Sequence, residues 1–140
     1  MIRARTENRI AFVELARLDK KNALTGEMYG QLADAIAGAG QDAQVRVVLL
    51  RGAPDCFCAG NDVGDFLKRP PLVEGSPSAR FFVAMQELRK PVVAAVGGPA
   101  VGIGTTMLLH CDLVYASPAA RFQMPFVPLG VVPELSLIHI

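Results

Sequence analysis

The sequence has little excess charge of either sign, and this limits the partners that it could bind. Its 140 residues contain 14 Lys and Arg and 13 Asp and Glu, which give a net charge of +1. The basic residues are scattered, and their densest cluster is Lys68-Arg69 in a proline-rich stretch. Nucleic acids and acidic membrane surfaces are bound by clustered positive charge. We therefore expect that the protein binds neither nucleic acid nor a membrane.

Long apolar runs are also missing. No run reaches the ~18 residues that a membrane-crossing helix requires, and residues 1–6 lack the apolar core of a signal peptide. Hydrophobic residues nevertheless make up 51% of the chain and charged residues 19%. This composition is typical of one core-rich globular domain, and we expect a cytoplasmic location.

Cysteines are few and do not have the spacing of a metal site. A single residue separates Cys56 from Cys58, and no histidine accompanies them. Neither Cys58 nor Cys111 has a histidine base that the sequence would place beside it. We expect free thiols in a reducing compartment, no metal and no cysteine nucleophile.

Apolar runs and helical spacing alternate along the chain. The pattern predicts a helix that begins after Thr25 and ends near Gly38 and Gly40, and another that begins with Ser76 as its N-cap. A continuous β-branched run at 45–51 predicts a strand that is covered on both faces. The remaining predicted elements are strands at 2–6, 10–15, 91–96 and 113–116, a loop over 52–64, a tight turn over 97–102 and a short helix over 104–110. This alternation predicts an α/β domain with parallel strands.

Two glycine-bearing loops, 58–63 and 97–104, each follow a predicted strand. Glycine permits the positive φ and close approach that would let backbone N–H groups converge on one small volume. Such a volume suits an oxygen that gains negative charge during a reaction. Structural turns and phosphate binding remain alternatives. The glycines match neither the dinucleotide fingerprint nor a phosphate loop, and a G-x-S-x-G nucleophile elbow is absent.

The particular residues around these loops match a known pattern in several places. The matching segments, in order, are Lys21-Asn22-Ala23-Leu24, Phe57-Cys58-Ala59-Gly60-Asn61-Asp62, Lys90-Pro91-Val92-Val93-Ala94-Ala95-Val96, Gly102-Ile103-Gly104, Cys111-Asp112-Leu113-Val114-Tyr115-Ala116 and the run from Phe122 to Glu134. With them the chain resembles the crotonase (enoyl-CoA hydratase/isomerase) superfamily over essentially all of residues 1–134. The resemblance implies an α/β fold of stacked β-β-α turns, a spiral whose C-terminal part is missing here. It also implies an acyl-CoA thioester substrate, which carries its own coenzyme A so that no separate cofactor is needed, and homotrimers or dimers of trimers.

The resemblance also assigns roles to individual positions. The backbone N–H groups of Asn61 and Ile103 would form the oxyanion hole. The positions that would bind the substrate are Lys21, Ala23, Leu24, Ala59, Gly60, Asp62, Val63, Gly102 and Pro125. Ordinary turn capping is the alternative for Asn61 and Asp62. For Asp112 we expect a structural hydrogen bond.

The choice of reaction depends on three positions. Hydratases of this superfamily place two glutamates across the double bond, at positions where this sequence has Thr106 and Phe126. Neither residue can act as a general base near neutral pH. Glu134 instead resembles the base of the Δ3-Δ2-enoyl-CoA isomerase branch, which moves a proton from C2 to C4 through a dienolate. Apolar neighbours should raise its pKa and help that transfer. Alternatives are a solvated loop acid, hydration or thioester hydrolysis with acids from a missing C-terminal half, and an inactive fragment that at most binds acyl-CoA.

The last six residues, 135–140, form an abrupt tail. One codon choice for them resembles the end of a transposon-based sequencing adapter, and a natural C-terminal strand is the alternative. We expect residues 1–134 to be a partial acyl-CoA-binding domain and 135–140 to be non-native.

Overall fold

The computed structural model describes residues 1–68 and 75–132. Its strands are β1 (Ile2–Glu7), β2 (Ile10–Leu15), β3 (Val47–Arg51), β4 (Val92–Val96), β5 (Pro99–Val101), β6 (Leu113–Ala116) and β7 (Arg121–Gln123). Its helices are α1 (Gly26–Gln41), α2 (Val63–Phe66), α3 (Pro77–Glu87) and α4 (Ile103–Thr106), with 3-10 turns at Leu18–Lys20 and Met107–His110. Glu134 and the tail at 135–140 lie outside the described residues.

The main sheet has the strand order β1-β2-β3-β4-β6. β1 and β2 form an antiparallel hairpin whose two turn residues, Asn8 and Arg9, have φ values of 50° and 65°. Positive φ at both central residues gives a turn whose twist matches that of the flanking strands. The other neighbours in the sheet are parallel. The predicted α/β class with parallel strands is confirmed.

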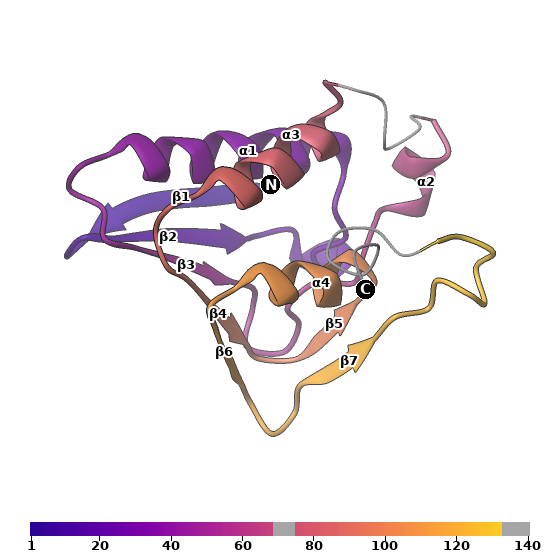
Figure 1. The fold of residues 1–140 in the computed structure, drawn as a ribbon. Helices are drawn as coiled ribbons and strands as arrows, with labels where there is room; N and C mark the ends of the chain where they lie inside the picture. Colours follow the sequence, from indigo (N-terminus) through magenta and orange to yellow (C-terminus); the bar gives the residue numbers. More distant parts are fainter. Residues whose placement is uncertain (69–74, 133–140) are drawn as a thin grey trace.

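The main core lies between this sheet and helices α1 and α3, which run side by side over one face (Figure 1). Val48 and Leu50 of β3 point into it and are each 1% exposed. The other β3 residues, on the opposite face, are half-buried. The prediction that this strand is covered on both faces is therefore wrong for the described residues, because successive side chains alternate between a covered face and an open one.

A second layer of short parallel pairings lies beside the main sheet. β5 pairs with β7, Cys58 pairs with Ala100, and Leu24 pairs with Asn61. Each main-sheet strand from β2 to β4 thus leads into a short second-layer segment and then a helix, and β6 leads into β7 (Figure 1). This confirms the expected spiral of β-β-α turns. β5 lies inside the segment predicted as a tight turn. Its three residues lie between glycines, and so short a run of extended backbone gives no recognisable strand pattern in the sequence.

The predicted helix starts are confirmed by their caps. The side chain of Thr25 accepts a hydrogen bond from the Met28 N–H, and that of Ser76 accepts one from the Ala79 N–H. α1 continues through the glycines predicted to end it and stops at Gln41. The predicted helix over 104–110 is a short α-helix followed by a 3-10 turn, and α2 begins within the predicted loop. Within residues 1–68 and 75–132, no helix has the length and apolar character needed to cross a membrane.

Candidate active site

Asn22 joins two loops at the carboxyl end of the sheet. It is fully buried and has a φ of 57°, in the left-handed region that asparagine tolerates better than most residues. Its Oδ1 accepts a hydrogen bond from the Arg17 N–H at 2.8 Å. Its Nδ2 donates to the carbonyl oxygens of Phe57 at 3.0 Å and Cys56 at 3.3 Å. The amide therefore fixes the loop over 17–24 against the segment that leads into the first glycine-bearing loop.

Leu24 pairs with that loop on both sides of Asn61. The Leu24 N–H donates to the Gly60 carbonyl and the Asp62 N–H donates to the Leu24 carbonyl, both at 2.8 Å. In a parallel pairing of this kind, the residue between the two bonds directs its own N–H and C=O away from its partner. The N–H of Asn61 therefore faces away from Leu24.

The two glycine-bearing loops contact each other directly. The Cys58 N–H donates to the Pro99 carbonyl at 3.1 Å, and the Val101 N–H donates to the Cys58 carbonyl at 2.8 Å. Gly60 has a φ of +98°, and a side chain there would lie 3.1 Å from the Val101 carbonyl oxygen. The loop that contains Asn61 and the loop that contains Ile103 are thus joined along their backbones.

Ile103 opens α4 directly after Gly102, whose φ of 54° only glycine adopts readily. The N–H groups of Thr105 and Thr106 both donate to the Gly102 carbonyl. The Ile103 N–H has no backbone acceptor within residues 1–68 and 75–132. A first-turn N–H of this kind is available to an external acceptor. The Ile103 side chain is 1% exposed, so the backbone is fixed by packing on the core.

A small cavity of about 210 Å³ lies beside Asn61. Tyr29, from α1, donates a hydrogen bond through its hydroxyl to Asn61 Oδ1 at 2.6 Å. The residues that line the cavity include three of the predicted substrate-binding and oxyanion positions, Leu24, Asn61 and Asp62. The structure therefore brings these three together.

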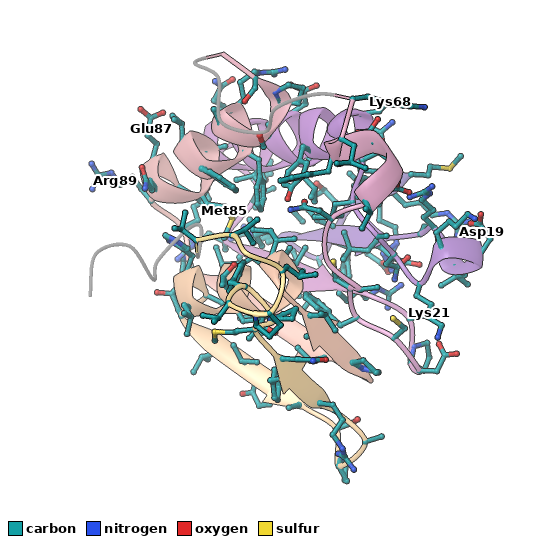
Figure 2. The ribbon with its side chains drawn as sticks, turned by 90° about the vertical axis from the view of Figure 1, so that its right-hand side faces the viewer. Asp19, Lys21, Lys68, Met85, Glu87 and Arg89 are labelled. Atoms are coloured by element: carbon teal, nitrogen blue, oxygen red, sulfur yellow. The ribbon has the colours of Figure 1, made fainter. Side chains whose placement is uncertain are left out.

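The other predicted positions differ in how closely they approach this cavity. Ala59 donates its N–H to the Lys21 carbonyl at 3.0 Å, and the Ala23 carbonyl accepts from Arg17, so these positions belong to the joined loops. Lys21 is exposed, on the same side of the molecule as Asp19 (Figure 2). Val63 is 70% exposed. Pro125 is half-buried, and its carbonyl accepts from the Leu129 N–H within its own turn.

The two hydratase positions are occupied by residues without a carboxylate. Thr106 is fully buried, and its hydroxyl has no hydrogen-bond partner within the described residues. Phe126 is 7% exposed. The predicted structural role of Asp112 is confirmed, since its carboxylate accepts a hydrogen bond from the Val92 N–H at 2.7 Å.

Ionisable groups near the loops have clear causes for their pKa shifts. The hydrogen bond from Arg17 lowers the pKa of the Asp62 carboxyl, and the N–H of Asp65 adds to this effect. The same carboxylate caps α2, so turn capping accounts for the Asp62 side chain. Burial raises the pKa of Cys58 to about 12. Its thiol is therefore protonated at neutral pH and is not a nucleophile.

No role was assigned to Arg17 or Tyr29 from the sequence, and Asn22 was included only as part of the loop over 21–24, although all three contact the joined loops. In the sequence, Asn22 lies within the motif Lys21-Asn22-Ala23-Leu24, between a basic residue and two apolar ones. This position was the only sequence signal that pointed to it. Arg17 and Tyr29 carry no local signal, because their partners are 45 and 32 residues away in the sequence.

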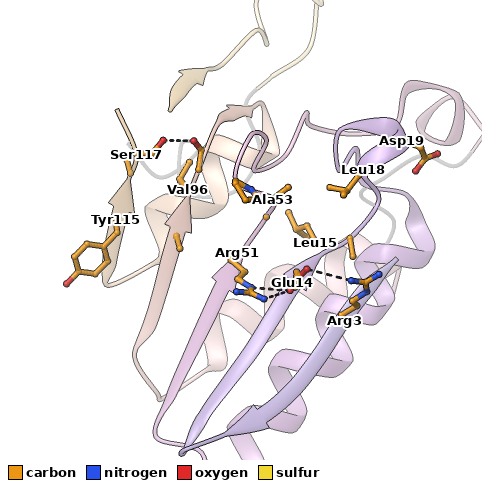
Figure 3. Close-up of a pocket in the computed structure, with 16 residues that line it drawn as sticks. Arg3, Glu14, Leu15, Leu18, Asp19, Arg51, Ala53, Val96, Tyr115 and Ser117 are labelled. Atoms are coloured by element: carbon orange, nitrogen blue, oxygen red, sulfur yellow. Dashed lines mark hydrogen bonds and ion pairs between the residues drawn. The ribbon is translucent and has the colours of Figure 1, made fainter. Parts of the chain in front are cut away.

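A larger, open depression of about 840 Å³ lies elsewhere, on the uncovered face of the main sheet. Figure 3 shows Arg3, Glu14 and Arg51 in a row across it, and Arg51 donates to Glu14 at 2.6 Å. None of the predicted site residues is among the described residues that line it. The predicted site residues therefore lie apart from the larger depression.

Known proteins match the chain over most of its length. The sequence pattern of the enoyl-CoA hydratase/isomerase family matches residues 5–140. The chain is 35% identical over 140 residues to the 1,2-epoxyphenylacetyl-CoA isomerase of Escherichia coli, covering 95% of this chain and 53% of that protein. It is 36% identical over 136 residues to human enoyl-CoA delta isomerase 2, covering 92% of this chain and 34% of that protein.

Among solved structures, Pseudomonas aeruginosa OdaA superposes with a TM-score of 0.92 at 54% identity, covering 95% of this chain and 54% of that one. The chain thus spans about half the length of its bacterial relatives. The family pattern extends over nearly the whole sequence, and the fold agrees with that of the solved structure. The chain belongs to the enoyl-CoA hydratase/isomerase family.

Proposed function

We propose that the protein moves the double bond of a 3-enoyl-CoA to C2. The observation that carries the proposal concerns the two positions where hydratases of the family carry a glutamate. This chain has Thr106 and Phe126 there, and neither of these buried residues has a carboxylate. Addition of water requires a general base and a general acid at those positions. Isomerisation requires one base and a site for the enolate oxygen.

The enolate oxygen would bind to the N–H groups of Asn61 and Ile103. Removal of a proton from C2 moves the electron pair toward the thioester carbonyl, whose oxygen becomes negative. Backbone N–H groups that are already oriented stabilise this charge without reorganising, and one such donor is worth about 10²–10³ in kcat. The backbone pairings around Leu24 and Cys58 support a fixed orientation for both donors.

Glu134 would transfer the proton. Its carboxylate takes the proton from C2 and returns it to C4, while the double bond forms between C2 and C3 and the carbonyl is restored. The reaction consumes nothing and leaves Glu134 ionised, so a single acid completes the cycle. An apolar environment around Glu134 would make its carboxylate more basic.

The loops around the cavity would bind the rest of the substrate. Lys21, Ala23 and Leu24 on one loop and Ala59, Gly60, Asp62 and Val63 on the other would contact the coenzyme A portion, with Gly102 and Pro125 beside the acyl group. No cofactor beyond the coenzyme A of the substrate is required. The homotrimer, or dimer of trimers, stays a prediction.

The test is Glu134→Gln in the full-length protein that carries this sequence. We expect isomerisation to be lost while the Kd for an acyl-CoA stays within about twofold, because the amide keeps the shape of the side chain and removes the base. Glu87→Gln, on the exposed side of α3, is the matched control and should be fully active. Unchanged turnover in the Glu134 variant would contradict the proposal.

A further inference from the structure

Arg17 links the two segments that fix the backbone of Asn61. Its Nη1 donates to the Asp62 carboxylate at 2.8 Å and to the Ala23 carbonyl at 2.9 Å. Both charged side chains are about one-fifth exposed, so the pair is more shielded from water than a surface ion pair. Hydrogen bonds between charged groups in such a setting are short and strong.

Asp62 is held at three points. Its Oδ2 accepts from Arg17, its Oδ1 accepts from the Asp65 N–H at 3.1 Å, and its own N–H donates to the Leu24 carbonyl. Asn61 directly precedes it, so the peptide that follows Asn61 has little freedom. A shift of Asp62 would therefore turn the Asn61 backbone with it.

Arg17 is itself fixed by both the side chain and the backbone of Asn22. Its N–H donates to Asn22 Oδ1 at 2.8 Å, and its carbonyl accepts from the Asn22 N–H at 2.9 Å. The guanidinium therefore extends from a rigid point and couples a buried loop to the residue after Asn61. Displacement of a reacting or stabilising group by about 1 Å can cost about 100-fold in rate.

We infer that Arg17 is a positioning residue for the oxyanion hole, and that the Arg17–Asp62 pair sets the direction of the Asn61 N–H toward the thioester carbonyl. The inference rests on the proposed function, because it assumes that Asn61 binds that oxygen. Arg17 does not touch the reacting atoms. Its effect passes through Asp62 and Ala23.

The experiment replaces Arg17 by Met in the full-length protein that carries this sequence. The matched control is Arg80→Met, which removes the exposed ion pair between Arg80 and Asp34 on the helices. For 3-enoyl-CoA, we expect kcat to fall about 10- to 100-fold in the Arg17 variant with KM within about threefold. The control should match wild type in both constants.

A second readout reports on the oxyanion hole directly. The infrared stretch of a ¹³C-labelled thioester carbonyl, in bound saturated acyl-CoA, falls in frequency when N–H groups polarise it. We expect this shift in wild type and in Arg80→Met, and a smaller shift in Arg17→Met. A merely structural role for Arg17 would lower the thermal midpoint and leave the carbonyl frequency of the folded, ligand-bound variant unchanged.

The outcomes separate the two claims. If the carbonyl frequency of the bound acyl-CoA is lowered in wild type but 3-enoyl-CoA is not isomerised, the proposed reaction is wrong. The infrared comparison of wild type with Arg17→Met then decides the positioning role by itself. Equal kcat and equal carbonyl frequency in Arg17→Met and wild type would overturn the inference. If Arg17→Met fails to fold, Asp62→Asn is measured in the same way, since it keeps an oxygen for the Asp65 N–H. If neither variant folds while Arg80→Met does, the pair is a stability element and the inference is rejected.

Discussion

Gly104 packs against the backbone of Cys58. A methyl group at position 104 would lie 2.6 Å from the Cys58 carbonyl oxygen and 2.8 Å from its Cβ. This contact is where α4 meets the first glycine-bearing loop. The carbonyl of Cys58 also accepts the hydrogen bond from Val101 that joins the loops, so neither backbone can retreat without breaking it.

Gly104→Ala should therefore destabilise the protein and separate the loops. We expect a loss of about 1–3 kcal/mol in the free energy of unfolding, because the added methyl meets backbone atoms. Gly30→Ala is the control, since position 30 lies in α1 with open space around it and should gain about 0.5–1 kcal/mol. Urea unfolding measures both. An equal effect of the two substitutions would show that the contact at Gly104 is not tight.

Asn22→Ala should be among the most costly substitutions in the chain. It leaves the Arg17 N–H and the Phe57 carbonyl without the partners that the amide provides. We expect a loss of about 2–4 kcal/mol, measured as the free energy of unfolding in urea. Asn22→Gly removes the side-chain amide but keeps the positive φ, which glycine adopts readily. It therefore tests the hydrogen bonds separately from the backbone conformation. A near-normal stability for Asn22→Gly would mean that the backbone conformation, and not the hydrogen bonds, is what asparagine supplies.

Asp62 should make stability depend on acidic pH. Its pKa is lower in the folded protein than in the unfolded chain, chiefly because of Arg17, so the unfolded chain takes up the proton first as pH falls. The stabilisation is complete above the ordinary carboxyl pKa and is lost as pH drops through the lowered folded value. Asp62→Asn should thus be less stable than wild type near neutral pH, and the difference should shrink as the pH falls below the ordinary Asp pKa of about 3.9. A difference that stays constant across this range would argue against ionisation of Asp62 as its source.

Local and periodic signals predicted most of the fold from the sequence. Thr25 and Ser76 cap helices as their side chains and positions indicated, and the strands at 10–15 and 113–116 have the predicted bounds. β5 and β7 were not predicted, because three-residue strands carry too short a pattern. β3 is not buried on both faces. A run of β-branched residues indicates a strand but does not indicate which of its faces are covered.

The predicted site residues were identified from sequence motifs. The side chains that hold those residues in place could not be identified in this way. The resemblance indicated Asn61 and Ile103, and the structure places their two loops in contact through Cys58. Arg17 and Tyr29 reach this region across long stretches of sequence, and such contacts leave no local pattern. The missing carboxylates at Thr106 and Phe126 were visible in the sequence, and the structure adds that both side chains are buried.

The most direct measurement of the proposed chemistry gives the full-length protein that carries this sequence 3-enoyl-CoA and 2-enoyl-CoA in parallel, and follows double-bond migration and water addition separately. With no carboxylate at either hydratase position, we predict rapid conversion of 3-enoyl-CoA to 2-enoyl-CoA and no 3-hydroxyacyl-CoA from either substrate. Formation of 3-hydroxyacyl-CoA from 2-enoyl-CoA, without migration of the double bond of 3-enoyl-CoA, would contradict the account.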